Sequence, residues 1–255
     1  MIRKSLCFLL LALWATHTAE AQTVGVVMSG GGAKGLYHIG VLQALEENGI
    51  PVDYVSGTSM GSIIAAMYAA GYSPAEMRAI VASGQVKEWV SGRIPDSYLP
   101  YYREINRTPS FITIRLNLSK RAAGESRFRL PSHLLSSTQI DLALTGLFAG
   151  ATAAADRNFD SLMVPFRCVA SDMNSRRPVV MRRGDLGEAV RSSMSIPLVF
   201  QPVEMDSMLL YDGGIYNNFP WQTLDEEFSP DLLIGSKCTS GNTATDGNSN
   251  LMEQA

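Results

Sequence analysis

The sequence predicts an α/β protein built on a mainly parallel sheet. Short apolar runs that end in glycine alternate along the chain with segments of helical spacing, and this alternation produces parallel sheets with right-handed crossovers. The 255 residues are 46% apolar and 18% charged. That composition is typical of globular proteins and excludes a disordered chain or a coiled coil. The length allows a single large core.

The first half of the chain shows the strand and helix signals most clearly. Apolar residues recur at every third position from Leu36 to Leu45, and Asn48-Gly49 follows as a typical helix end. We expect strands at residues 24–28 and 52–55 and helices at 33–48, 62–70 and 74–82, the last of them capped by Ser73 and opened by Pro74.

The second half is less regular. We expect helices at 141–155 and 185–193, the second capped by Asp185, and strands at 164–170, 178–181, 208–211 and 232–234. Apolar and polar residues also alternate from 112 to 118. From residue 239 onward the chain is rich in Gly, Asn, Ser and Thr, which predicts a disordered tail over 239–255.

The N-terminus has the features of an export signal. Arg3 and Lys4 precede an unbroken apolar run at 6–15, and residues 19–21 have the small-x-small pattern that signal peptidase cleaves. The run is too short to span a membrane, which takes about 20 residues. We therefore expect a signal peptide at 1–21, a domain at 22–238 and an exported protein, periplasmic or secreted.

Metal and nucleic-acid sites are not expected. The net charge of −3 gives no basic footprint for phosphate binding. Cys168 and Cys238 remain after removal of the leader, and their spacing matches no zinc motif. Both lie in apolar, strand-like runs, where a buried free thiol is commoner than a disulfide.

A first candidate motif is Gly57-Thr58-Ser59-Met60-Gly61, which lies between an expected strand and an expected helix. A strand that turns sharply into a helix exposes its central serine, and small flanking residues let that turn close. The helix N-terminus favours the negative charge that develops when such a serine attacks a carbonyl. The placement, more than the pattern itself, predicts a nucleophile at Ser59.

A second motif, Gly30-Gly31-Gly32-Ala33-Lys34-Gly35, follows the first strand. Three interpretations are open at this point. The motif contains G-x-G-x-x-G and Asp53 lies about twenty residues on, which satisfies the dinucleotide-binding fingerprint. Bare glycine amides could instead form an oxyanion hole. A tight turn with no chemical role is the third interpretation.

The third motif is Asp212-Gly213-Gly214, directly after the expected strand at 208–211. Asp-Gly after a strand is often only a turn, but Asp212 could also be the base that activates Ser59. His38 and His133 both precede Asp212, so a triad in the order Ser, Asp, His is excluded. We expect both histidines to be structural, and a Ser–Asp pair stays open.

Together the three motifs resemble those of the patatin-like phospholipase family. The resemblance covers about 24–237 and includes the segment Ser192-Ser193-Met194-Ser195-Ile196-Pro197. It implies a three-layer α/β/α fold, Ser59 as nucleophile, Asp212 as general base and residues 30–35 as oxyanion hole, with Gly31 and Gly32 as the main donors. It further implies hydrolysis of fatty-acyl esters, such as those of phospholipids, without a cofactor.

Residues 96–135 carry seven basic and three acidic side chains, with aromatic residues between them. We expect this segment to contact an anionic lipid surface, where each basic residue can contribute about 1 kcal/mol. A solvated surface flap is the alternative.

Two other functions remain alternatives to a lipid acyl hydrolase. One is dinucleotide binding by residues 30–35. The other is a non-catalytic module of a larger protein, which would be associated with the outer membrane if the chain is a truncated form.

Overall fold

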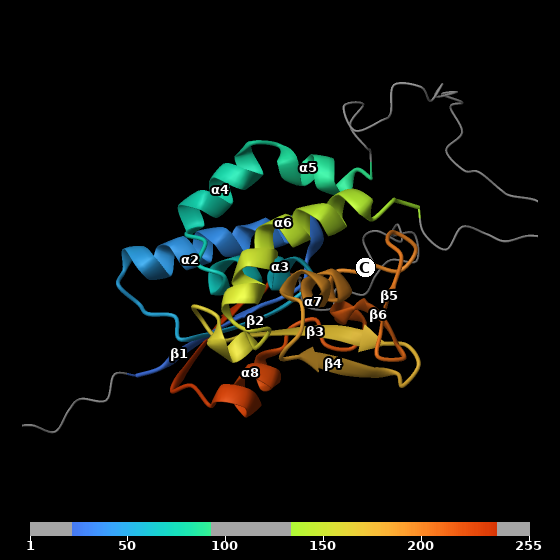
Figure 1. Ribbon diagram of the computed structural model, residues 1–255. Coiled ribbons are helices and arrows are strands. Elements are labelled where there is room, and N and C mark those ends of the chain that lie inside the picture. The colour runs from blue at the N-terminus through green and yellow to red at the C-terminus, as the bar shows by residue number, and fades with distance from the viewer. Residues whose placement is uncertain (1–21, 93–133, 239–255) are drawn as a thin grey trace, which may run out of the picture.

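The computed structural model describes residues 22–92 and 134–238 (Figure 1). Three of the expectations above lie outside these residues: the signal peptide at 1–21, the tail at 239–255, and the basic segment apart from its last two residues. They stay predictions. No helix in the described part of the chain is long and apolar enough to cross a bilayer.

Within the described residues, seven strands form one sheet. They are β1 (Val24–Met28), β2 (Tyr54–Thr58), β3 (Phe166–Asp172), β4 (Arg177–Met181), β5 (Val203–Met205), β6 (Met208–Asp212) and β7 (Leu232–Ser236). The strand order is β5-β6-β3-β2-β1-β7, and β4 pairs with β3 off this path. Strands β7, β1, β2 and β3 are parallel neighbours, whereas β4, β5 and β6 join the sheet through antiparallel pairs. The predicted α/β class is confirmed.

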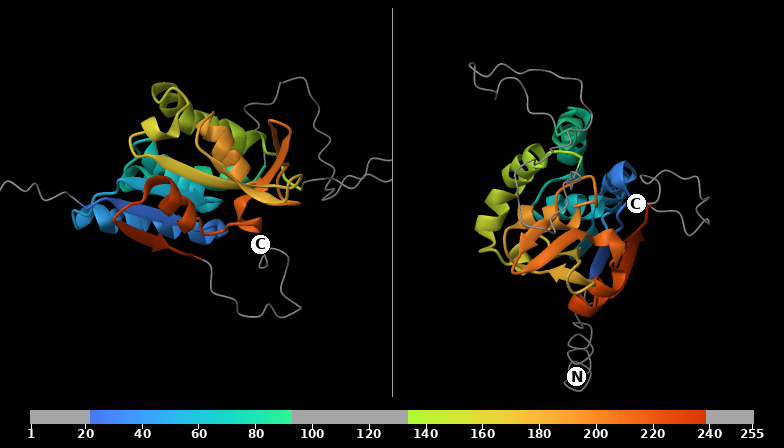
Figure 2. Two further views of the ribbon diagram at one scale, coloured as in Figure 1. Left: turned by 90° about the horizontal axis from the view of Figure 1, so that it is seen from below. Right: turned by 90° about the vertical axis from the view of Figure 1, so that its right-hand side faces the viewer.

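Helices cover both faces of this sheet. They are α2 (His38–Glu47), α3 (Met60–Ala69), α4 (Pro74–Ala82), α5 (Gln85–Val90), α6 (Thr138–Ala154), α7 (Leu186–Ser193) and α8 (Trp221–Phe228). Figure 1 shows α8 below the sheet and the other helices above it. In the turned views of Figure 2, β7 (red) runs beside β1 (blue), as their parallel pairing requires. The arrangement has the three α/β/α layers that were expected.

Helix α3 is the centre of the larger helical layer. It packs on the sheet and is covered by neighbouring helices, so it buries residues on nearly every side, among them Ile64, Ala65 and Met67. This explains why the sequence is apolar over almost the whole of this segment, with no polar stripe. Helix α2 is amphipathic and buries only its Ile39, Leu42 and Leu45 side.

Strand β3 brings together two strands that are far apart in sequence. On one edge it pairs with β4 through Cys168–Asp172. Its opposite edge pairs first with β2, as far as Val169, and then with β6, from Ala170 onward. Because β2 is parallel and β6 antiparallel to β3, the C-terminal ends of β2 and β6 meet end to end. Ser59 directly follows the last residue of β2, and Asp212 is the last residue of β6.

The expected helix caps are present, and three elements were not predicted. Ser73 and Glu76 form a reciprocal capping box at the start of α4, and the Asp185 side chain accepts a hydrogen bond from the Glu188 amide. The helix expected from residue 33 begins with a 3₁₀ segment at Gly32–Tyr37 and becomes α-helical only at His38. Elements α5, β5 and α8 carry no strong sequence signal and were not expected.

Candidate active site

Ser59 alone makes the turn from β2 into α3. Strand β2 ends at Thr58 and α3 begins at Met60, and between them Ser59 has φ 53° and ψ −123°. This backbone conformation is rare for a residue with a side chain. It is the strained strand-to-helix turn that was expected for this serine. The turn places Ser59 at the positive end of the α3 dipole.

The flanking glycines let the turn close. A Cβ built on Gly57 would lie 2.4 Å from the Gly61 carbonyl group, and a Cβ on Gly61 would lie 2.4 Å from the Met28 carbonyl oxygen. Both neighbours are backbone, so neither can move aside as a flexible side chain would. Glycine at 57 and 61 therefore allows α3 to approach both β2 and β1.

Substitution of Gly61 tests this close approach. We expect Gly61→Ala to lower the free energy of unfolding by about 1–3 kcal/mol, because the added methyl group forces α3 away from β1. Gly40→Ala is the matched control, since Gly40 is exposed within α2 and its Cβ would meet nothing within 4 Å. That change should raise stability by about 0.5–1 kcal/mol. Urea denaturation measures both, and equal stability of Gly61→Ala and the unmodified chain would contradict the explanation.

Asp212 faces Ser59 directly. The Ser59 hydroxyl donates to Asp212 Oδ2 over 2.6 Å, and the Gly214 amide donates to Oδ1 over 2.7 Å. Ser59 and Asp212 are only 6% and 7% exposed. Burial raises the pKa of Asp212, and the hydrogen bonds from Ser59 and Gly214 oppose this rise. A carboxylate with a raised pKa that accepts a serine hydroxyl proton is suited to act as a general base.

The glycine-rich loop lies beside this pair. A Cβ on Gly30 would lie 3.1 Å from the Ser59 Cβ, and a Cβ on Gly35 would lie 2.5 Å from the Met60 side chain. The Gly30 amide donates to the Asn218 carbonyl over 3.0 Å. By contrast, no described residue accepts a hydrogen bond from the amides of Gly31 or Gly32.

The other two predicted loop residues, Ala33 and Lys34, form no hydrogen bond with the Ser59–Asp212 pair. Ala33 and Lys34 are exposed in the 3₁₀ segment, and the Lys34 amide donates to the Gly31 carbonyl. Nothing in their contacts joins them to Ser59 or Asp212.

Gly213 and Gly214 let the chain turn tightly after Asp212. A Cβ on Gly213 would lie 2.1 Å from the Val169 carbonyl oxygen, and a Cβ on Gly214 would lie 2.9 Å from Asp212 Oδ1. The Thr58 hydroxyl donates to the Asn217 carbonyl over 2.9 Å and ties the end of β2 to the segment that follows Asp212.

Asp53 lies at the opposite end of β1 from the glycine-rich loop. Its carboxylate accepts the Val24 amide over 2.7 Å at the start of β1, whereas the loop follows the other end of that strand. A five-residue strand spans about 16 Å. A dinucleotide held by the loop would therefore be out of reach of Asp53, and this part of the dinucleotide-binding fingerprint is absent from the fold.

His38 has a structural environment, as expected. Its Nδ1 lies 2.6 Å from the Ser236 hydroxyl and its Nε2 lies 2.9 Å from the Ser29 carbonyl oxygen. Burial lowers the pKa of His38. These bonds hold the ends of β7 and β1 together, and His38 is not bonded to the Ser59–Asp212 pair. Cys168 is a buried free thiol in β3, as expected, whereas Cys238 is free but only half-buried and lies just after β7. His133 lies outside the described residues.

Two residues beside the pair were not predicted individually. The Ser193 hydroxyl accepts the Ser59 amide over 3.0 Å, and the Asn218 carbonyl accepts the Gly30 amide. The segment that holds Ser193 was part of the family resemblance, but nothing in the sequence indicates this contact. Asn218 lies six residues after Asp212, and no sequence signal pointed to it.

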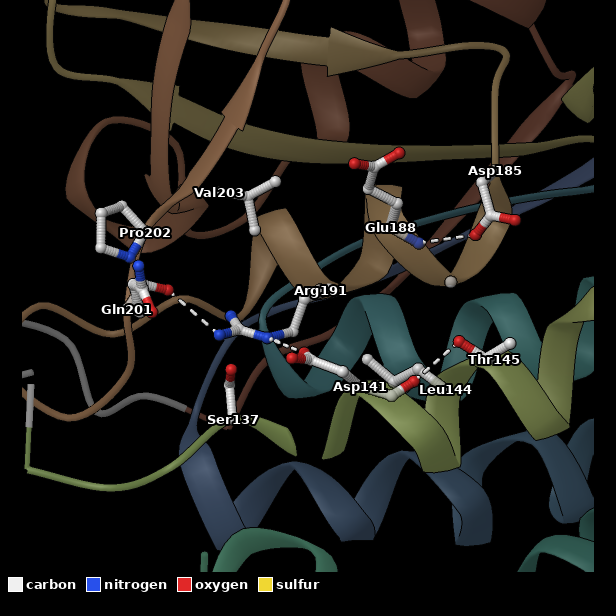
Figure 3. A pocket seen from close by; sticks show the side chains of 11 residues that line it. Ser137, Asp141, Leu144, Thr145, Asp185, Glu188, Arg191, Gln201, Pro202 and Val203 are labelled. Carbon is white, nitrogen blue, oxygen red and sulfur yellow. Dashed lines mark hydrogen bonds and ion pairs between the residues drawn. The ribbon is translucent and has the colours of Figure 1, made fainter. Parts of the chain in front are cut away.

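A cavity of about 540 Å³ lies apart from these residues, between α6, α7 and the start of β5 (Figure 3). None of the predicted site residues lines it. Arg191 projects into the cavity and is held by Asp141 and by the Gln201 carbonyl. Among the described residues, no group of three or more His, Cys, Asp or Glu side chains could hold a metal ion.

Comparison with known proteins identifies the relatives of this chain. It is 32% identical over 200 residues to an uncharacterized NTE family protein of Mycobacterium tuberculosis, covering 78% of this chain and 27% of that protein. It is 29% identical over 213 residues to Lysophospholipase NTE1 of Cryptococcus neoformans, covering 84% of this chain and 11% of that protein. The chain thus spans a small part of the length of these relatives.

Structural comparison and a family model agree with these matches. The fold is similar to that of VipD from Legionella pneumophila, with a TM-score of 0.52, 16% sequence identity, and coverage of 85% of this chain and 49% of VipD. This similarity bears on the fold alone. The family model for patatin-like phospholipases matches residues 26–225, which is most of the chain. The chain therefore belongs to the patatin-like phospholipase family.

Proposed function

We propose that the chain is a serine-dependent lipid acyl hydrolase, a carboxylic ester hydrolase in which Ser59 is the nucleophile and Asp212 the general base. The observation that carries this proposal is the 2.6 Å hydrogen bond from the buried Ser59 hydroxyl to the buried Asp212 carboxylate. Membership of the patatin-like phospholipase family supports it.

The first half of the reaction is acylation of Ser59. Asp212 Oδ2 takes the hydroxyl proton while Ser59 Oγ attacks the ester carbonyl carbon and forms a tetrahedral intermediate. The amides of Gly31 and Gly32 have no acceptor among the described residues, so they can donate to the oxyanion. When the C–O bond breaks, the proton on Asp212 passes to the leaving alkoxide, and the acyl group stays on Ser59.

The second half is hydrolysis of the acyl-enzyme. Asp212 takes a proton from water, and the resulting hydroxide attacks the acyl carbon. Collapse of this second intermediate releases the fatty acid and returns the proton to Ser59 Oγ. The sequence of steps uses neither a metal nor a cofactor.

Two observations favour a lipid over a small polar ester. Ile215 and Tyr216 follow Asp212 by three and four residues, and their apolar side chains are 41% and 39% exposed. We propose that these two side chains contact the acyl chain of the substrate. One relative in the same family carries the name lysophospholipase, which makes a phospholipid or lysophospholipid the first substrate to test.

Fatty acid release from phospholipid vesicles tests the proposed function. The chain should release free fatty acid without added metal, and prior treatment with a fluorophosphonate should abolish release and label Ser59. A soluble p-nitrophenyl ester, assayed in parallel, separates loss of chemistry from loss of access to lipid. Absence of release and of p-nitrophenyl ester hydrolysis by the folded chain would contradict the proposal and favour a non-catalytic module.

The same vesicles address the basic segment at 96–135. We propose that it contacts anionic lipid, because it carries a net charge of +4. Release should then be faster from vesicles that contain anionic lipid than from neutral ones, and the difference should shrink at high salt. Equal rates on both compositions would contradict this contact.

The leader-like sequence at 1–21 supports a further proposal, that the hydrolase is exported to the periplasm or secreted. N-terminal sequencing of the exported protein should then begin at Gln22. If the protein is found only in the cytoplasm and still carries residues 1–21, the proposal of export is wrong.

A further inference from the structure

The end of α7 contacts both residues of the proposed catalytic pair. The hydroxyl of Ser193 accepts a hydrogen bond from the backbone amide of Ser59, with a distance of 3.0 Å. Two residues later, the carbonyl of Ser195 accepts the backbone amide of Asp212, with a distance of 2.9 Å. One short segment thus holds the main chain at the nucleophile and at the base.

The orientation of the Ser193 hydroxyl is determined by its two bonds. It donates its only proton to the Val169 carbonyl over 2.6 Å, so a lone pair is left for the Ser59 amide. Val169 is the β3 residue at which pairing with β2 ends, before pairing with β6 begins at Ala170. Ser193 is fully buried, so water cannot take over either bond.

The bond from Ser193 matters because of the conformation of Ser59. With φ at +53°, Ser59 precedes α3, and no carbonyl within that helix is available to its amide. Without Ser193 this amide would be buried and unpaired, which is unfavourable. The backbone could relax from its strained conformation, and the Ser59 hydroxyl would move away from Asp212.

The far side of α7 is anchored as well. The Ser195 hydroxyl donates to the Arg191 carbonyl over 2.8 Å and accepts from the Arg191 guanidinium over 2.6 Å. Arg191 in turn binds Asp141 of α6 over 2.6 Å and the Gln201 carbonyl over 3.0 Å (Figure 3). These contacts hold the segment from 191 to 195 in place while its opposite side supports the catalytic pair.

We propose that Ser193 is a positioning residue that holds the backbone of Ser59 so that its hydroxyl meets Asp212. This inference rests on the proposed function and assigns to it a residue that does not itself touch the substrate. The same hydrogen bond means that the Ser59 amide is not an oxyanion-hole donor, because it already donates to Ser193.

Ser193→Ala tests the role of Ser193. A displaced nucleophile should lower kcat on a p-nitrophenyl ester by on the order of 10²-fold, with little change in KM. The acid limb of the pH–rate profile should also move to higher pH. The bond from Ser59 lowers the pKa of Asp212, so weakening it raises the pH at which Asp212 becomes an active base.

Ser192→Ala is the matched control. Ser192 is equally buried on the same helix, but its hydroxyl donates only to the Glu188 carbonyl of its own turn. We expect the kcat and pH profile of this variant to match those of the unmodified chain. Ser193→Cys keeps the shape of the side chain, with a somewhat larger atom that is a weaker donor and acceptor, and its kcat should fall between those of serine and alanine. It also serves if Ser193→Ala does not fold.

The outcomes separate this inference from the proposed function. If Ser59→Ala is inactive but Ser193→Ala and Ser193→Cys keep the kcat and acid limb of the unmodified chain, Ser193 has no positioning role and the proposed function stands. A loss of kcat with an unmoved acid limb would show a general effect on folding and would also overturn the inference. If the unmodified chain hydrolyses no ester, both proposals fail.

Discussion

Replacing Ser59 with alanine is expected to lower the rate of ester hydrolysis by about 10⁴- to 10⁶-fold, the loss seen when a serine hydrolase loses its nucleophile. No other hydroxyl among the described residues is shown within hydrogen-bonding distance of Asp212, so no neighbouring serine can replace it. The initial rate on a p-nitrophenyl ester and fatty acid release from vesicles measure the loss.

Two further variants make the Ser59 result specific. Ser56→Ala removes a buried hydroxyl from the same strand, one that approaches only the Pro220 carbonyl, and it should leave the rate unchanged. Ser59→Gly should be as inactive as Ser59→Ala but more stable by about 1 kcal/mol, since glycine adopts positive φ without strain. Hydrolysis by Ser59→Ala within 10-fold of the unmodified rate would mean that another group is the nucleophile.

Asp212→Asn is expected to change activity and stability in opposite directions. An amide cannot take the Ser59 proton, so kcat should fall by about 10³- to 10⁴-fold. Its oxygen can still accept the Gly214 amide, so the turn after β6 should survive. The variant should be more stable than the unmodified chain at neutral pH, because it no longer buries a carboxylate.

The sign of the stability change follows from the raised pKa of Asp212. Because the pKa of Asp212 is higher in the folded chain than in the unfolded chain, protonation of Asp212 stabilises the fold. This stabilisation is fully present below the unfolded pKa and is lost as pH rises through the folded pKa. The advantage of Asp212→Asn should therefore be present above the folded pKa and vanish below the unfolded one. Urea denaturation at pH 3 and pH 8 measures it, because the unfolded pKa of the aspartate is 3.8, and an advantage that grows toward acid would contradict the assignment.

Much of the candidate site was predictable because its motifs follow strands. Ser59 and Asp212 could be placed at strand ends from local glycine patterns and apolar runs. Their contact could not be derived from pattern alone, because it depends on β6 joining β3 antiparallel from Ala170 onward. The repeating βα pattern predicts parallel strands, and nothing in it indicates that β6 pairs in the antiparallel direction.

The elements that were missed have weak local signals for physical reasons. Strand β5 has three residues, and the turn between β5 and β6 uses Asp206 and Ser207 at positive φ, where Asn-Gly or Asp-Gly is the usual signal. Helix α8 has no side-chain cap, and only Thr223 and Leu224 are buried in it. Short elements of this kind are stabilised by packing on the sheet more than by their own sequence.

The end-to-end meeting of β2 and β6 also determines when the chain can become active during its synthesis. Ser59 is made 153 residues before Asp212, and its base has no place to dock until β3 has paired with β2. At 5–20 residues per second, a ribosome needs roughly 8–30 s to cover that interval. Throughout it, the nascent chain carries the proposed nucleophile without its proposed base, so the proposed activity would be withheld until most of the domain has been translated and folded.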